Sequence, residues 1–306
     1  TATSNTITMT VNPTVTPSVT VSANPGITIC AGTNVTFTAV PVNGGTTPAY
    51  QWKKNGSNVG TNSTTYADNG LLSGDLITVE LTSNAICATP SNVTSNTLTM
   101  TVNPVLTPSV TISANPGVSI CAGTNVTFTA VPVNGGISPT YQWLKNALPV
   151  GTNATTYSDA GLLNGDVITC VLNSSELCAA PASATSNTLT ITVVTNTTPI
   201  VSIVASPGNT ICPGTSATFT ATATNSGLTP SYQWLLNGSN VGTNSTTYSN
   251  ASLITGDAIT CEVTSSDPCA LPTMATSNAI VMTVADLLDP TAVCQNVAVT
   301  LDGSGN

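Results

Sequence analysis

The segments NVTFTAV (125–131), YQWLKN (141–146) and VITCVLN (167–173) decide the fold. Every second residue of the first segment is apolar, which is the period of a β-strand that buries one face. Turn sequences such as PVNGG separate such segments. The many β-branched residues within the segments disfavour helices. Seven or so short strands, with a turn signal about every ten residues, predict an all-β sandwich.

The same pattern occurs three times, at a spacing of 91 residues. A repeat of this length suits one small domain with one core. We therefore expect three repeats in tandem, at residues 14–104, 105–195 and 196–285. An array of repeats usually works through its length, its spacing or its multivalency. The aromatic residues that we expect in the cores are Trp52, Trp143, Trp234, Phe37, Phe128 and Phe219.

The two ends of the sequence differ from this pattern. Residues 3–13, TSNTITMTVNP, match TSNTLTMTVNP at 94–104. We therefore expect residues 1–13 to be the last strand of a preceding repeat. Residues 286–306 do not match the repeat and are expected to begin a different β module. Both observations indicate a segment of a longer protein.

The composition excludes several classes of function. The chain has three lysines, no arginine, no histidine and twelve acidic residues, for a net charge of −9. So few cations exclude a surface that binds the phosphates of nucleic acid. Without histidine, Ser-His and Cys-His catalytic arrangements are impossible. No apolar run reaches the roughly 18 residues that would predict a membrane-spanning helix. We expect no enzyme activity, no cofactor and no membrane insertion in this segment.

The pattern ICAGTNVTFTA…YQW…VGTN…TTY…L-x-G-D-x-I-T-C…TSN-x-L-T-x-T-V resembles a known group of repeats. These are the immunoglobulin-like or PKD-like repeats of giant Bacteroidota surface proteins, including gliding adhesins secreted by the type IX system. The closing segment resembles the start of an HYR-type module. The resemblance implies tandem immunoglobulin-like β-sandwiches in a linear array, located outside the cell or on its surface. It also implies a stalk, filament or adhesive function.

The resemblance further implies that these repeats lack the core disulfide of immunoglobulin domains. Ala130 takes the place of the first core cysteine, so Trp143 is expected to pack over Ala130 and Cys170. The position of Cys170 and Cys261 is held by Val79 in the first repeat. A position that accepts valine or cysteine behaves as a small core hydrophobe, so both cysteines are predicted to be buried free thiols.

The remaining cysteines are expected to form disulfides, since the chain has the character of a secreted protein. One class (Cys30, Cys121, Cys212) and a second class (Cys87, Cys178, Cys269) occur in every repeat. In immunoglobulin topology the two classes lie at opposite ends of a sandwich, about 20 Å apart along one strand. A disulfide requires Cα atoms within about 7 Å.

We therefore favour bridges between successive repeats, namely Cys30–Cys178 and Cys121–Cys269. Cys212 would then pair with a following module at Cys294, and Cys87 with a preceding one. Bridges within each repeat remain the alternative: Cys30–Cys87, Cys121–Cys178 and Cys212–Cys269.

Other polar motifs have mainly structural interpretations. We expect the Gly-Asp turns at Asp75, Asp166 and Asp257 to cap turns, because a calcium site needs several clustered carboxylates. The threonines at 97, 99 and 101 are expected on the solvent face of a strand. Glycosylation sequons are numerous, and in a bacterial host they are expected to be unmodified. Examples are Asn34, Asn62, Asn125, Asn153 and Asn244.

Three functions remain open at this point. The first is a structural or adhesive stalk whose partners are neighbouring repeats of the same chain. The second is binding of polysaccharide or another cell surface through loop tips such as residues 43–45. The third is an accessory module of a secreted polysaccharide-degrading enzyme. Edge strands of the sandwiches would permit lateral self-association.

Overall fold

The computed structural model describes residues 1–285, so Cys294 and the expected module at 286–306 lie outside it. The described chain contains thirty short β-strands and no helix. It divides into two compact units. One comprises residues 1–113, 128–157 and 167–189, and the other comprises residues 114–127, 158–166 and those from 190 onward. The first unit contains the whole of the first repeat, and the second contains the described part of the third.

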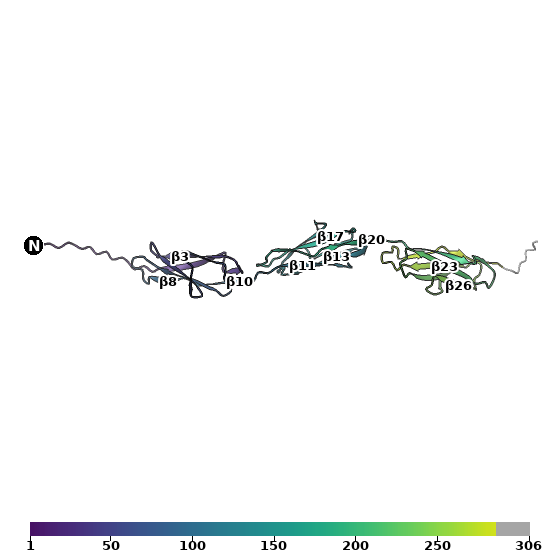
Figure 1. Cartoon of the computed structure of the whole chain (residues 1–306), viewed down its shortest axis with the longest axis horizontal. Coiled ribbons are helices and arrows are strands. Elements are labelled where there is room, and N and C mark those ends of the chain that lie inside the picture. Colours follow the sequence, from purple (N-terminus) through teal and green to yellow (C-terminus); the bar gives the residue numbers. More distant parts are fainter. Residues whose placement is uncertain (286–306) are drawn as a thin grey trace, which may run out of the picture. The chain divides into compact units, whose positions relative to one another are not determined.

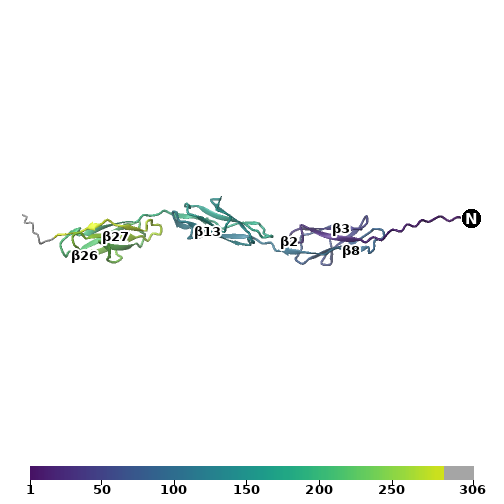
Figure 2. The ribbon, with the colours of Figure 1, turned by 180° about the vertical axis from the view of Figure 1, so that it is seen from behind.

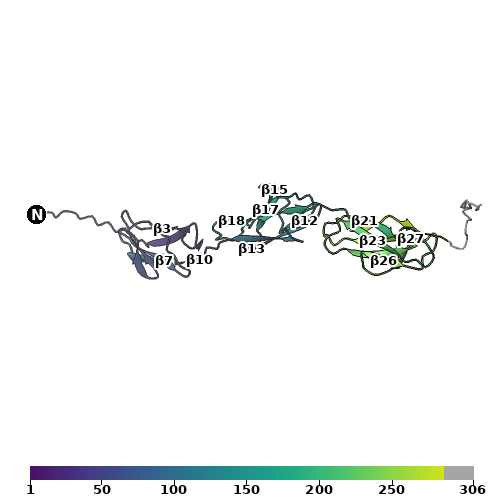
Figure 3. The ribbon, with the colours of Figure 1, turned by 45° about the vertical axis from the view of Figure 1, so that its right-hand side comes forward.

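The first repeat is a two-layered sandwich. Figure 3 shows β3 and β7 in different layers, and Figure 1 shows the same separation of β3 from β8. One sheet has the order β1-β3-β6, and the other has the order β5-β4-β7-β8 with β9 also paired to β7. A short parallel pair, β2 with β10, lies beside them. The bounds are β1 Ser18–Asn24, β2 Thr28–Cys30, β3 Val35–Val42, β4 Ala49–Lys54, β5 Ser57–Val59, β6 Thr65–Asp68, β7 Leu76–Thr82, β8 Asn92–Thr94, β9 Leu98–Thr99 and β10 Thr101–Asn103.

The same strands and sheet orders recur in the other two repeats. The second repeat contains β11 Ser109–Asn115, β12 Ser119–Cys121, β13 Val126–Val133, β14 Thr140–Lys145, β15 Leu148–Val150, β16 Thr156–Asp159, β17 Val167–Asn173, β18 Ser183–Thr185, β19 Leu189–Thr190 and β20 Thr192–Val194. The third contains β21 Ile200–Ser206, β22 Thr210–Ile211, β23 Ala217–Thr224, β24 Ser231–Leu236, β25 Ser239–Val241, β26 Thr247–Asn250, β27 Ala258–Thr264, β28 Met274–Thr276, β29 Ile280–Val281 and β30 Thr283–Val284.

The all-β sandwich expected from the sequence is confirmed, with two differences in detail. The last segment of each repeat, expected as one strand, divides into two, such as β9 and β10. Its first half pairs with β7, whereas its second half pairs in parallel with β2. A further short strand, such as β18, precedes this segment and pairs with β17. Strands of two or three residues are too short to show the alternating pattern by which a strand is recognised in the sequence.

Each core is built around one Trp, one Phe and one Tyr. In the first repeat the rings of Phe37, Trp52 and Tyr66 have centroids 5.9 to 6.4 Å apart. The Trp52 indole is fully buried and donates its Nε1–H to the Ser63 carbonyl at 2.9 Å. Aromatic packing and a satisfied indole N–H make this a favourable buried site. The six predicted core aromatics are all fully buried: Trp52, Trp143, Trp234, Phe37, Phe128 and Phe219.

The cores of the second and third repeats each contain one cysteine as a free thiol. Cys170 and Cys261 are fully buried, and each lies opposite the tryptophan of the neighbouring strand. Val79 holds the equivalent place opposite Trp52. Burial raises the pKa of both thiols to about 11, so they stay protonated at neutral pH. They are packing groups with little nucleophilic character.

Exchange of the buried thiol for valine should therefore cost little. Cys170→Val is expected to change the free energy of unfolding by less than about 1.5 kcal/mol, since the swap nearly conserves volume. Trp143→Ala should cost about 3–5 kcal/mol, because it empties the centre of the core. Urea denaturation of the two variants measures both values. A Cys170→Val cost as large as that of Trp143→Ala would contradict the packing role of the thiol.

Candidate functional site

Backbone hydrogen bonds anchor the chain on both sides of the linker between the first and the second repeat, each within its own repeat. Asn103, the last residue of β10, accepts a hydrogen bond from the Ala31 amide at 2.9 Å. Leu106 donates to the Cys178 carbonyl at 2.9 Å and accepts from the Ala180 amide at 2.9 Å. Only Pro104 and Val105 lie between these two anchored residues. Since proline has a fixed φ, the linker has little conformational freedom.

A disulfide lies beside this short linker. Cys30, which pairs with Asn103 in the parallel ladder, is bonded to Cys178, whose carbonyl accepts the Leu106 amide. The Cα atoms of the two cysteines are 5.5 Å apart, and the residues are 148 apart in sequence. The polypeptide and the disulfide therefore both connect the ends of β2 and β10 to the loop that contains Cys178. We call this arrangement of residues 30, 103–106 and 178 the first joint.

The second unit contains an equivalent arrangement. Cys121 is bonded to Cys269, with Cα atoms 5.3 Å apart and again 148 residues between them. The Ala122 amide donates to the Val194 carbonyl at 3.0 Å, and the Thr197 amide donates to the Cys269 carbonyl at 2.9 Å. Thr195 and Asn196 form the intervening linker. Residues 121, 194–197 and 269 make up the second joint.

Two cysteines of the same classes are exposed free thiols. Cys87 corresponds to Cys178 and Cys269, and Cys212 corresponds to Cys30 and Cys121. The backbone around Cys87 resembles that of the joints, because Val15 donates to the Cys87 carbonyl at 3.1 Å and accepts from the Thr89 amide at 3.0 Å. The pairing of Cys212 with Cys294, expected from the sequence, involves a residue outside the described range.

Accessibility should separate the free thiols of the described chain into two groups. We expect iodoacetamide to label Cys87 in the native, unreduced protein, and to label Cys212 in a Cys294→Ser variant, which removes its expected partner. Cys170 and Cys261 should stay unlabelled until the protein is unfolded, because they are buried and protonated. Mass spectrometry of tryptic and further digested peptides measures the labelling. Native labelling of Cys170 would show that the core opens at that position.

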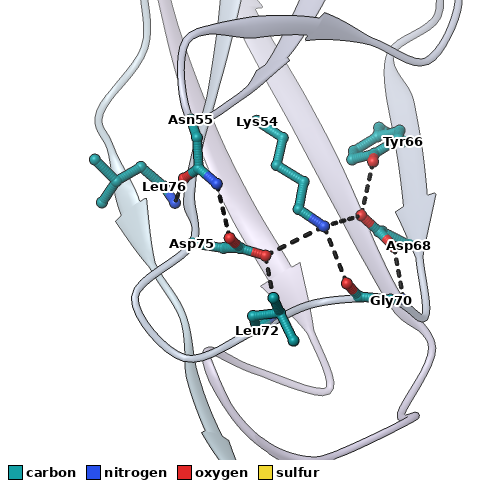
Figure 4. Close-up of polar contacts among 8 residues, drawn as sticks. All are labelled: Lys54, Asn55, Tyr66, Asp68, Gly70, Leu72, Asp75 and Leu76. Atoms are coloured by element: carbon teal, nitrogen blue, oxygen red, sulfur yellow. Dashed lines mark hydrogen bonds and ion pairs between the residues drawn. The ribbon is translucent and has the colours of Figure 1, made fainter.

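The first repeat also contains a polar cluster that sequence reasoning missed (Figure 4). Lys54, at the end of β4, donates to Asp68 Oδ2 at 3.0 Å and lies 3.2 Å from Asp75 Oδ2. Since β4 and β6 belong to different sheets, the Lys54–Asp68 ion pair connects the two layers. Asn55 completes the cluster by donating to Asp75 Oδ1 at 2.8 Å.

The charges of this cluster stabilise one another. Burial opposes ionisation of Asp75, but hydrogen bonds from the Leu72 amide and the Asn55 side chain, together with the Lys54 ammonium, lower its pKa. The pKa of Asp68 is lowered too, since the Gly70 amide, Lys54 and Tyr66 outweigh the effect of burial. Burial and the hydrogen bond to Asp68 raise the pKa of Tyr66 to about 12. These charge-assisted hydrogen bonds connect side chains of the two layers, so the cluster acts as a structural clamp.

The third repeat shows how the cluster is replaced. Leu236 stands in the place of Lys54, and Asn250 stands in the place of Asp68. Both members of the ion pair, the lysine and the aspartate, are thus replaced by uncharged residues. Asn250 now donates to the Tyr248 hydroxyl at 3.1 Å, while Asp257 keeps its turn-capping bond from the Ile254 amide at 2.9 Å. This paired change in the sequence was the signal that would have revealed the ion pair.

The clamp predicts a matched pair of variants. Lys54→Leu alone leaves two carboxylates without their cation and should destabilise the first repeat by about 1–3 kcal/mol. Lys54→Leu with Asp68→Asn reproduces the third repeat and should recover most of this loss. Urea denaturation at pH 7 measures both. Equal destabilisation by the single and the double variant would contradict the clamp.

The same carboxyls predict an acid dependence of stability. Their folded-state pKa values are lower than the usual value of about 3.9, so the ionised groups stabilise the fold above that pH. This contribution is lost as the pH falls through the folded-state pKa. The free energy of unfolding between about pH 2 and 4 should therefore fall less steeply in the Lys54→Leu, Asp68→Asn variant. An unchanged slope would show that Asp68 does not contribute.

The other polar residues singled out in the sequence have structural roles. The Asp75 and Asp166 side chains accept hydrogen bonds from the Leu72 and Leu163 amides, which confirms the turn-capping prediction. Among residues 1–285 no cluster of three potential metal ligands occurs, and no helix there has the length and hydrophobicity to cross a bilayer. Asn62 Oδ1 accepts from the Tyr50 amide at 2.8 Å, so this sequon asparagine holds its loop against β4. The threonines of the predicted ladder are exposed: Thr97, Thr99 and Thr101.

Comparisons with known proteins return structures but no sequence relatives. No protein-family model and no curated protein matches the chain. Three N-terminal domains of the highly immunogenic outer capsid protein Hoc of bacteriophage RB49 are 15% identical, with a TM-score of 0.36, covering 89% of this chain and 99% of that one. Fibronectin(III)-like modules of Clostridium thermocellum CbhA are 18% identical, with a TM-score of 0.33. The match covers 58% of this chain and 97% of that one. The eight N-terminal Ig domains of Down syndrome cell adhesion molecule are 14% identical, with a TM-score of 0.33. The match covers 88% of this chain and 42% of that one. Similarities this low carry no information about function.

Proposed function

We propose that this chain is a structural segment of a larger extracellular surface protein, and that its disulfides limit bending between successive repeats. The observation that carries the proposal is the joint itself. Asn103 and Leu106 are each fixed by backbone hydrogen bonds, and a disulfide connects the end of β2 to the loop that holds Leu106. A second covalent connection next to a two-residue linker removes most hinge motion that a single linker permits.

The position of the disulfides supports a mechanical role over a folding role. Their cysteines lie at the ends of the sandwiches, while the cores contain free thiols or valine. Each core has its own aromatic cluster and needs no cross-link to be filled. Reduction should therefore loosen the joints while the sandwiches stay folded. Disulfides also fit an oxidising, extracellular location.

The surface chemistry fits a spacer as well. With three lysines and twelve acidic residues in 306, few exposed charges are available for screening by salt. The spacing between repeats should then depend little on ionic strength. The resemblance to Bacteroidota stalk and gliding-adhesin repeats supports the same function, with the repeats spacing or displaying a binding end.

Loop tips provide a second candidate function. Ile137 and Leu228 occupy the same loop position in two repeats and are completely exposed, at 102% and 101%. Exposed apolar side chains at repeated sites favour adhesion to polysaccharide or another surface. A glycan array probed with the intact chain tests this role. Binding that is lost in an Ile137→Ser, Leu228→Ser variant would support it, and uniform absence of binding would contradict it.

Small-angle X-ray scattering tests the spacer role. The oxidised chain should give a narrow distribution of overall dimensions that is nearly unchanged between low and high salt. A variant with serine at the four bridging cysteines (Cys30, Cys121, Cys178 and Cys269) should give a broader distribution with the same β-sheet circular dichroism. The matched control is Cys170→Ser, which removes a thiol without touching a joint. Identical distributions for the oxidised chain and the four-serine variant would refute the mechanical role.

A further inference from the structure

The two joints give the second repeat a pair of covalent connections on each side, where a linker alone would give it one. On one side, the chain enters at Leu106, and Cys178 is bonded to the first repeat. On the other side, the chain leaves after Val194, and Cys121 is bonded to the third repeat. The second repeat is thus attached to each neighbour by both its backbone and a disulfide.

Two short stretches of backbone join these connections across the repeat. Residues 106–121 lead from the first linker to the disulfide of the second joint, through β11 and β12. Residues 178–194 lead from the disulfide of the first joint to the second linker, through β18, β19 and β20. We call these stretches the first tract and the second tract. Each contains about 16 residues, so neither can extend beyond about 55 Å.

The two tracts are hydrogen-bonded to each other where they begin and where they end. At the first joint, Leu106 donates to the Cys178 carbonyl and accepts from the Ala180 amide, each at 2.9 Å. At the second joint, β12 pairs in parallel with β20, and the Ala122 amide donates to the Val194 carbonyl at 3.0 Å. The tracts thus run in the same direction and have nearly equal lengths. Tension applied at the joints would be divided between them, because neither tract is long enough to stay slack.

The centre of the core lies outside both tracts. Residues 122–177 contain β13 to β17, and Figure 2 shows β13 within the second repeat. They include the buried rings of Phe128 and Trp143 and the buried thiol of Cys170. Without the disulfides, the backbone is the single covalent path through the repeat, and it passes through residues 122–177. With the disulfides, tension can cross the repeat without entering them.

We propose that the disulfides let the second repeat transmit tension along its two tracts, so that its core is not pulled open. The segment then keeps its length under load, because the repeat cannot lengthen further than the covalent tracts allow. Without the disulfides, residues 106–194 could extend to about 310 Å. Resistance to tension is a function beyond the limit on bending, and it rests on the same joints as the proposed function.

Magnetic tweezers combined with thiol labelling test this proposal on the full chain. A Cys261→Val background leaves Cys170 as the remaining buried thiol of residues 1–285, and iodoacetamide first blocks the exposed thiols. The chain is then pulled from both ends in the presence of a fluorescent maleimide. In the oxidised chain, Cys170 should stay unlabelled, and no single extension step should exceed about 200 Å.

The variant with serine at all four bridging cysteines is the first control. At the same force it should lengthen in steps of more than about 200 Å and become labelled at Cys170, because residues 122–177 then bear the tension. Without force it should stay unlabelled, which verifies that its core is folded. If this variant resists the force as well as the oxidised chain does, the proposal is wrong.

Variants that keep one disulfide test the tracts separately. Cys30→Ser with Cys178→Ser keeps the first tract, and Cys121→Ser with Cys269→Ser keeps the second. Since one covalent tract still crosses the repeat, Cys170 should stay unlabelled in both variants. Labelling of either variant as fast as the four-serine variant would overturn the proposal.

Peptide mapping of the same samples separates this proposal from the proposed function. If both disulfides are present and Cys170 of the oxidised chain is nevertheless labelled under force, the tracts do not protect the core. The limit on bending would then stand alone. If neither disulfide is present, the joints and the resistance to tension fail together.

Discussion

The constraint on which the rest of the structure depends is the parallel pairing of β2 with β10 and its equivalents. This pairing brings the last strand of a repeat to the residue of the Cys30 class at one end of the sandwich. After two linker residues, the chain forms hydrogen bonds to the loop that carries the Cys87 class in the next repeat. The disulfide follows from this geometry, since both cysteines lie beside the same short linker. The 91-residue period keeps the arrangement constant.

Fold and joint use separate groups of residues. The cores depend on Trp, Phe and Tyr packing, with either valine or a protonated thiol opposite the tryptophan. The first repeat adds an ion pair between its layers, which the third repeat replaces with Leu236 and Asn250. None of these groups belongs to a joint. Changes in redox conditions would therefore act on the connection between repeats before they act on the repeats themselves.

Periodicity and residue class were enough to predict the sandwich, the buried aromatics and the turn-capping aspartates. A strand that buries alternate residues has a period that the sequence displays directly, as in residues 125–131. The split of the last strand into β9 and β10 was missed because the two halves pair with different strands, while the alternation of apolar residues continues through both. The Lys54 clamp was missed because its members come from different sheets. Only comparison of the repeats at Leu236 and Asn250 would have exposed it.

The central claim is that disulfides connect successive repeats. Peptide mapping of the unreduced, thiol-blocked chain by mass spectrometry tests it most directly. The account predicts linked peptides that contain Cys30 with Cys178 and Cys121 with Cys269. Peptides that link Cys30 to Cys87, or Cys121 to Cys178, would contradict it.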